Sequence, residues 1–138
     1  MSQEGANRLL TWLLGVAAPI LPTVHLLGQP YTPLTTSLLT NYAANQVGPG
    51  IGYAPVQLTS PRASWTVSGL QEGAQALYLP VNWTFTAAVT VYGYYISDDN
   101  FGVSLWGEAL SPAFVYGAGG GVFALEPYLY LVNFGSPS

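Results

Sequence analysis

The sequence predicts a mainly β fold, an antiparallel β-sandwich of jelly-roll-like form with a short N-terminal helix or arm. Three observations lead to this prediction. Short segments rich in Val, Thr, Tyr, Phe and Trp alternate with turn signals after residue 50. Helical spacing of apolar residues is convincing only in 2–18. The chain has 138 residues, half of them hydrophobic, which suits one domain. We expect 1–138 to be that domain, with an N-terminal helix or arm at 1–21 and the sandwich at 22–138.

The N-terminal segment 2–18 is expected to be a helix that ends before Pro19. Its apolar run is too short to cross a bilayer, which takes about 20 residues. Glu4 beside Arg8 and a weak cleavage site argue against a signal peptide. The apolar side chains cover more than one face, so the helix needs cover from its own sheet or from a neighbouring subunit.

The rest of the chain has an extended pattern interrupted by turns. A first strand at 23–27 precedes a proline-rich loop, a mixed stretch at 38–45 and a Gly-Pro-Gly turn at 48–50. A glycine-rich loop is expected at 117–121. The further strands are expected at 53–58, 64–67, 76–79, 83–87, 89–97, 101–110, 113–116, 122–125 and 128–133.

The clearest unit is a hairpin of 89–97 and 101–110 around the turn residues 97–100. Simple alternation puts Val89, Val91 and Tyr95 on one face of its first strand. Tyr92, Tyr94 and Ile96 then share the other face. A strand that is apolar on both faces is covered on both faces. One cover is the sandwich core, and the other is a helix, a loop or another subunit.

Charged residues make up only 6% of the chain, against about 25% in a typical soluble domain. The only bases are Arg8 and Arg62, which excludes ordinary nucleic-acid binding and polybasic attachment to membranes. The chain has no cysteine, so disulfide scaffolds, zinc ribbons and thiol catalysis are excluded. A surface with so little charge indicates burial against other chains. The alternative is a monomer kept soluble by Asn, Gln, Ser and Thr.

Residues that could carry chemistry are few, and we expect no enzyme and no cofactor. His25 is the only histidine; a hydrogen-bonded strand residue is favoured over a general base, and no nucleophile elbow is present. Asp98, Asp99 and Asn100 offer calcium ligands but fit a solvated turn better. Glu108 and Glu126 are expected to accept local hydrogen bonds rather than act as a glycosidase pair.

Other motifs have similar competing interpretations. The glycines of 117–121 lack the Lys and Ser/Thr of a phosphate loop. Asn82-Trp83-Thr84 fits a glycosylation sequon at the start of an expected strand. The aromatic residues could stack on sugars, but at strand spacing they indicate a core or a subunit interface.

The order of these signals resembles small accessory structural proteins of tailed-bacteriophage virions, of the capsid-decoration (cement) or head/tail-fibre type. The resemblance runs from about Arg8 to Val132. It rests on Gly-Tyr-Ala-Pro-Val-Gln-Leu at 52–58, Trp65, Trp-Thr-Phe at 83–85, Val-Tyr-Gly-Tyr-Tyr at 91–95, Leu-Trp-Gly-Glu at 105–108 and Pro-Tyr-Leu-Tyr-Leu at 127–131. The low charge and the longer Pro-rich segment at 30–49 depart from this pattern.

The resemblance implies a non-enzymatic virion protein, often trimeric, that sits on or between capsid or tail subunits, with the capsid surface favoured over the tail. The most favoured role is a cement subunit that binds the major capsid protein, other virion proteins and its own copies. The alternative is a tail, baseplate or fibre module that binds host carbohydrate through aromatic residues. Two contact strips are expected: Leu9, Leu10, Trp12, Leu13 and Leu14 on the helix, and Tyr92, Tyr94 and Trp106 on an outer sheet face.

Overall fold

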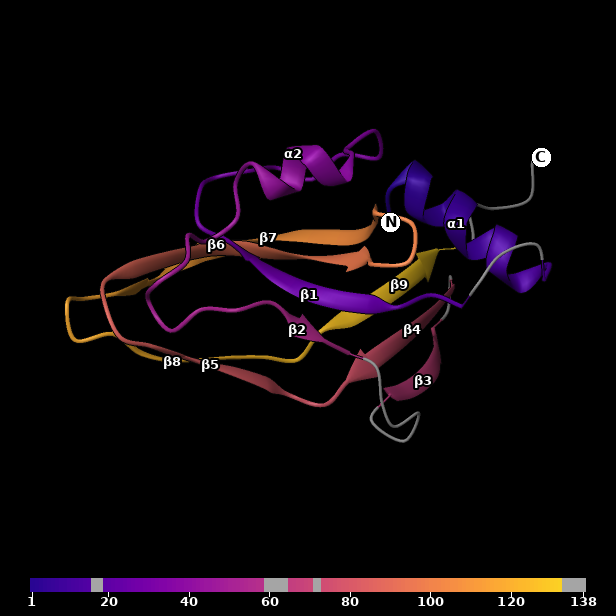
Figure 1. Cartoon of the computed structure of the whole chain (residues 1–138). Coiled ribbons are helices and arrows are strands. Elements are labelled where there is room, and N and C mark those ends of the chain that lie inside the picture. Colours follow the sequence, from indigo (N-terminus) through magenta and orange to yellow (C-terminus); the bar gives the residue numbers. More distant parts are fainter. Residues whose placement is uncertain (16–18, 59–64, 71–72, 133–138) are drawn as a thin grey trace.

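The fold consists of two layers of antiparallel strands, with two short helices on the outer side of one layer (Figure 1). The computed structural model describes residues 1–15, 19–58, 65–70 and 73–132. The first layer is a sheet in the order β2-β1-β6-β7. Its strands are β1 (Pro22–Leu27), β2 (Val56–Gln57), β6 (Val89–Asp98) and β7 (Val103–Tyr116).

The second layer has two parts, the sheet β3-β4-β9 and the pair β5-β8. Its strands are β3 (Trp65–Leu70), β4 (Gly73–Tyr78), β9 (Tyr128–Val132), β5 (Val81–Phe85) and β8 (Gly121–Leu125). The predicted β-sandwich with an N-terminal helix is confirmed. The expected strands at 101–110 and 113–116 are one continuous strand, β7, and the expected strand at 53–58 is reduced to the two residues of β2.

The main core lies between the two layers. In β5 every second side chain is buried, namely Val81, Trp83 and Phe85, because successive side chains of a strand point to opposite faces. They pack in one cluster with Val24 and Leu26 of β1 from the other layer. One face of the first sheet is therefore buried against the second layer. Its opposite face is the one that the two helices cover.

The β6–β7 hairpin departs from the predicted faces and turn. The turn occupies 99–102, where Gly102 has a positive φ of 65°, so it lies two residues later than expected. The register shifts between Val91 and Gly93, and this irregularity reverses the alternation. Val91 and Tyr94 therefore both join the main core, whereas Tyr95 lies in a second cluster.

Two helices cover the outer side of the first layer (Figure 1). Helix α1 (Gln3–Leu13) ends with Leu14 as its C-cap, followed by Gly15, whose φ of +70° suits the residue after a C-cap. It therefore ends earlier than the boundary predicted just before Pro19. Helix α2 (Leu39–Ala43) lies in the stretch that was expected only to be mixed. Its Tyr42 packs with Leu27 and Tyr95 in the second cluster. The helices thus cover part of the outer face of the β6–β7 hairpin, as expected for strands that are apolar on both faces.

Candidate functional site

Helix α1 is docked on β7 by small and polar residues. Ser2 caps the helix: its Oγ accepts from the Gly5 N–H at 3.1 Å and donates to the Ser104 carbonyl at 2.8 Å. A Cβ at Gly5 would lie 2.6 Å from the Ser104 carbonyl oxygen, so only glycine allows this approach. The first turn of α1 is therefore fixed against the backbone of β7.

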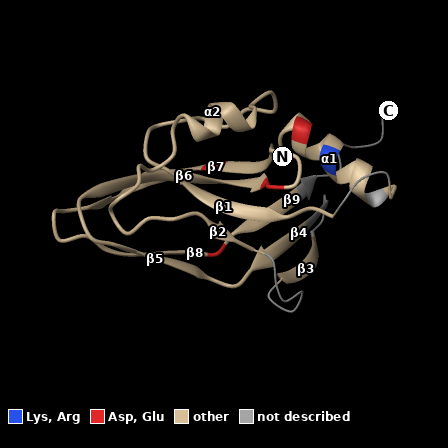
Figure 2. Ribbon diagram, in the orientation of Figure 1, with Lys and Arg blue, Asp and Glu red and all other residues tan. Residues whose placement is uncertain are grey.

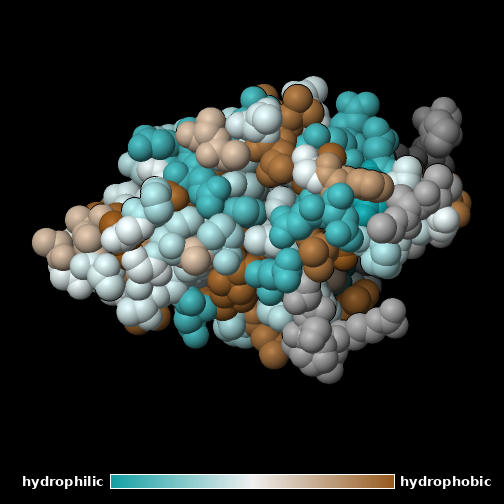
Figure 3. Space-filling view, viewed as in Figure 1, coloured by the Kyte–Doolittle hydropathy of each residue, from teal (hydrophilic) through white to brown (hydrophobic). Residues whose placement is uncertain are grey.

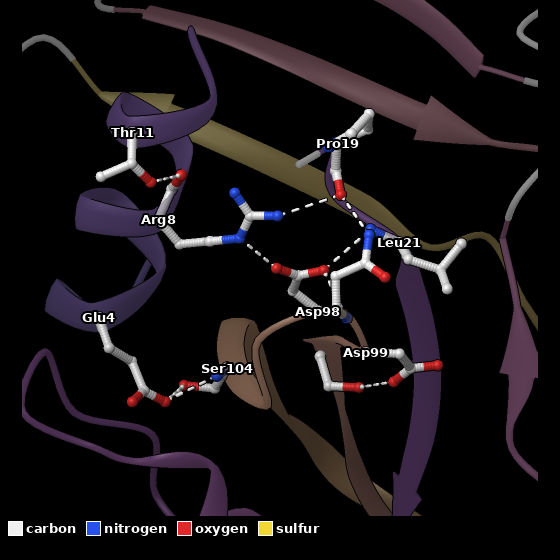
Figure 4. A network of polar contacts seen from close by, with 10 residues as sticks. Glu4, Arg8, Thr11, Pro19, Leu21, Asp98, Asp99 and Ser104 are labelled. Atoms are coloured by element: carbon white, nitrogen blue, oxygen red, sulfur yellow. Dashed lines mark hydrogen bonds and ion pairs between the residues drawn. The ribbon is translucent and has the colours of Figure 1, made fainter. Parts of the chain in front are cut away.

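Glu4 strengthens this docking from the same turn of α1. Its Oε1 accepts from the Ser104 N–H at 2.6 Å and from the Ser104 hydroxyl at 2.7 Å (Figure 4). The same oxygen accepts from the Leu39 N–H at 2.9 Å, at the start of α2. One carboxylate thus links α1, β7 and α2. It also occupies the N–H of Ser104 on β7, the strand at the edge of the first sheet.

Arg8 forms a buried ion pair with Asp98 at the end of β6 (Figure 4). Their side chains are 3% and 0% exposed. The guanidinium also donates to the Pro19 carbonyl at 3.1 Å and lies 4.1 Å from the centroid of the Phe101 ring.

The second oxygen of Asp98 accepts from the Leu21 N–H at 2.9 Å and the Asn100 N–H at 3.2 Å. The prediction of a solvated turn is therefore wrong for Asp98. The prediction is confirmed for Asp99, which is exposed.

Among the described residues Arg8 is the only Lys or Arg, as Figure 2 shows on α1. Two of the few ionic side chains, those of Glu4 and Arg8, thus hold the helix in place. Sequence reasoning missed this network, although a serine two residues before Glu4 is a recognisable helix-start signal.

The second half of α1 presents apolar side chains to solvent. Leu10 and Leu14 are 56% and 76% exposed, and Trp12 is 38% exposed. Leu9 is partly buried, and the side chain of Leu13 lies outside the described part. The docked face of the helix has the small and polar residues Ser2, Gly5 and Arg8. Its free face has two exposed leucines among the exposed polar residues Gln3, Asn7 and Thr11.

An apolar groove of about 570 Å³ lies beside this helix. Leu9 and Trp12 form one wall, and Trp65 and Val67 of β3 with Leu129 of β9 belong to the lining across from them. Among the described lining residues, Gln75 has the only polar side chain. The groove is in the size range of ligand pockets, about 300–1,000 Å³. On the face drawn in Figure 3, hydrophobic surface is divided into several patches by hydrophilic residues.

The second predicted strip is not brought together on an outer face. Tyr94 is 1% exposed, and its hydroxyl donates to Glu108 at 2.9 Å, so its placement on an outer face was wrong. Burial raises the pKa of Tyr94. Tyr92 is partly buried against the second cluster. Trp106 packs against the main core, with its ring 5.4 Å from that of Tyr128, and does not offer a free stacking platform.

His25 is a hydrogen-bonded strand residue, as predicted. Its ring stacks on Tyr95 at 4.4 Å, and its Nε2 lies 2.9 Å from the Ser97 hydroxyl. Ser97 donates its single proton to Asp99 at 3.1 Å, so Nε2 is the donor to Ser97. Burial lowers the pKa of His25 to about 4, although the charge of Asp99 opposes this. A general base would have to accept a proton from the serine hydroxyl, whereas here the histidine ring donates to it.

The other candidates lie apart. Glu108 accepts from Tyr94, whereas Glu126 is exposed beyond the end of β8. Residues 117–120 form the turn between β7 and β8, as predicted, and Gly121 is the first residue of β8. Within the described ranges, no three His, Cys, Asp or Glu residues form a group that could hold a metal ion. In the same part of the chain, neither helix has the length and apolar character needed to cross a membrane.

No family model, curated protein or solved structure matches this chain. The geometry of α1 and the groove beside it is therefore the observation on which a function has to rest.

Proposed function

We propose that this chain is a structural subunit of a larger protein assembly and that the outer face of α1 is one of its contact surfaces. The assembly that the sequence resemblance suggests is the virion of a tailed bacteriophage. Within it we propose the role of a capsid cement subunit that stabilises the shell by apolar contacts.

The observation that carries this proposal is a pair of exposed leucines on an anchored helix. The helix is held by Ser2, Glu4 and Arg8, so these leucines are presented by an element with a fixed position. Leu10 and Leu14 are 56% and 76% exposed. Burying a leucine contributes about 1.5–3 kcal/mol relative to leaving it exposed. This gain is available to a partner protein, and symmetry in a shell repeats it many times.

The sparse charge supports the same proposal. Only 6% of the residues are charged, and the ion pair of Arg8 and Asp98 is buried inside the molecule. The exposed half of α1 has Leu10, Thr11, Trp12 and Leu14 and no ionic side chain. A partner therefore meets an uncharged surface, which has little desolvation cost.

The test is the presence of the chain in purified phage particles. We expect a fixed copy number relative to the major capsid protein, and loss from particles of the double variant Leu10→Ser/Leu14→Ser. Val122→Ser is a matched control, because Val122 is 60% exposed on β8, away from α1. Absence of the wild-type chain from particles would refute the virion role. Normal incorporation of the double variant would refute the role of the α1 face.

A further inference from the structure

Strand β3 is the outermost strand of the sheet β3-β4-β9 (Figure 1). Its register with β4 continues without a shift from Trp65 to Leu70, and within the described residues β4 is its only pairing partner. Every second residue of an edge strand directs its N–H and C=O away from the neighbouring strand. The outer side of β3 is therefore a regular row of hydrogen-bonding groups, and the partner that fits such a row is another extended strand.

The edges of the first sheet differ from β3 because each has a feature that hinders pairing. Strand β2 has only two residues. Strand β7 has Pro112, which has no N–H to donate, and Glu4 occupies the N–H of Ser104. The register of β7 with β6 also shifts twice. Short strands, prolines, charges and bulges keep edges from pairing, and β3, with the sequence Trp-Thr-Val-Ser-Gly-Leu and an unbroken register, has none of them.

The side chains of β3 leave room for a neighbouring strand on both faces. Residues 66–69 are all exposed, and Val67 is 73% exposed. A Cβ at Gly69 would meet no atom within 4 Å beyond its chain neighbours, so open space lies over this position. Residues 128–130 of β9, at the other edge of the same sheet, are by contrast half-buried. The open edge of this sheet is therefore β3.

The sequence of β3 is complementary to itself in an antiparallel pair. When Val67 lies opposite Val67 of a second copy, Thr66 lies opposite Ser68 and Trp65 lies opposite Gly69. Valine pairs and Thr–Ser pairs across strands are stabilising. An aromatic ring opposite an edge glycine compensates for the missing side chain, and the open space at Gly69 can receive it. We infer that β3 pairs with β3 of a second copy in this register and forms a two-fold dimer.

The dimer joins the two copies through one continuous sheet. Each copy contributes three strands, so the joined sheet has six. Residues directly opposite each other in an antiparallel pair lie on the same face. Trp65 and Val67 both line the groove beside α1, so the two grooves open on the same side of the joined sheet. The inference goes beyond the proposed function, because Leu10 and Leu14 of the α1 face take no part in this contact.

The test uses the two-fold symmetry, which places residue 67 of one copy opposite residue 67 of the other. We expect the wild type to be a dimer of twice the 14.6 kDa chain mass in light scattering and sedimentation. Val67→Lys and Val67→Glu each place like charges opposite one another, so each variant alone should dimerise about 10-fold more weakly. An equimolar mixture of the two should dimerise as tightly as the wild type, because lysine then faces glutamate.

Two further variants serve as controls. Val115→Lys adds the same charge at a valine that is 75% exposed on β7, another edge strand, and it should dimerise as the wild type does. Leu10→Ser/Leu14→Ser should also form the dimer, which separates this contact from the role of the α1 face. Amide hydrogen exchange of residues 66–69 in the wild type should slow as the protein concentration rises.

Three results would overturn the inference. The first is a wild type that stays monomeric at its highest soluble concentration, or forms a trimer. The second is a mixture of the two charged variants, each folded by circular dichroism, that dimerises no more tightly than either alone. The third is exchange of residues 66–69 that does not depend on concentration, a measurement that needs no variant. None of these results affects the proposed function, which depends on α1.

Discussion

Replacing Arg8 by methionine tests whether the buried ion pair holds α1 to the sandwich. Asp98 is 0% exposed, and methionine fills similar space without charge. The variant leaves a buried carboxylate without its cation, while the N–H groups of Leu21 and Asn100 still donate to it. Loss of one partner of a buried pair is costly because the other charge cannot be solvated by water.

The expected cost is about 3–5 kcal/mol in the free energy of unfolding. For 138 residues, the unfolding entropy is about 0.29 kcal/mol/K at roughly 2.1 cal/mol/K per residue. The melting temperature should therefore fall by about 10–17 °C. The double variant Arg8→Met/Asp98→Asn should cost less than the two single variants together, by about 0.5–3 kcal/mol, because neither charge is then left alone.

Urea unfolding followed by tryptophan fluorescence and a calorimetric melt measure these quantities. Asn7→Met is the matched control: it places the same side chain at the neighbouring position of α1 and should change the free energy of unfolding by less than about 0.5 kcal/mol. A loss below about 1 kcal/mol for Arg8→Met, or strict additivity in the double variant, would refute the reasoning.

Three further predictions concern His25, Gly5 and Ser2. The pKa of His25 is about 4 in the folded protein, against an ordinary value of 6.5 for a solvated histidine. Between these two pH values the unfolded chain binds a proton at His25 and the folded chain does not. Stability should be full above pH 6.5 and fall by about 2 kcal/mol toward pH 4, with allowance for partial exposure; His25→Phe should flatten this slope. Gly5→Ala should destabilise by about 1–3 kcal/mol through overpacking against Ser104, although alanine favours helix by about 1 kcal/mol. Ser2→Ala should cost about 1–2 kcal/mol by removing the helix cap.

Urea titrations at a series of pH values check the first of these, and an unchanged slope in His25→Phe would contradict the assigned cause. The same titration at neutral pH checks the other two. A Gly5→Ala variant more stable than the wild type would mean that α1 is free to move away from β7. An unchanged free energy of unfolding in Ser2→Ala would mean that Glu4 alone suffices to hold the first turn of α1.

The exposure of Leu10 and Leu14 follows from a helical spacing that spreads apolar side chains over more faces than one sheet can cover. Their role as contact residues stays a prediction. Tyr94 was misplaced because the irregularity near Gly93 changes the side of every later residue in the strand. Nothing in the alternation of 89–97 reveals where such a shift occurs, since the strand is apolar on both faces.

Local chemistry determined the number and type of most elements. Residue period, β-branched and aromatic side chains, prolines and glycines act over a few residues, and they indicated the helix, the hairpin and the sandwich class from the sequence alone. Tertiary structure decided which sides of these elements face inward and which charges meet. Arg8 and Asp98 are 90 residues apart, so their pairing depends on how the whole chain folds. The orientation of α1 has the same origin, because its polar contacts to β6 and β7 fix which side of the helix is buried and leave two leucines exposed.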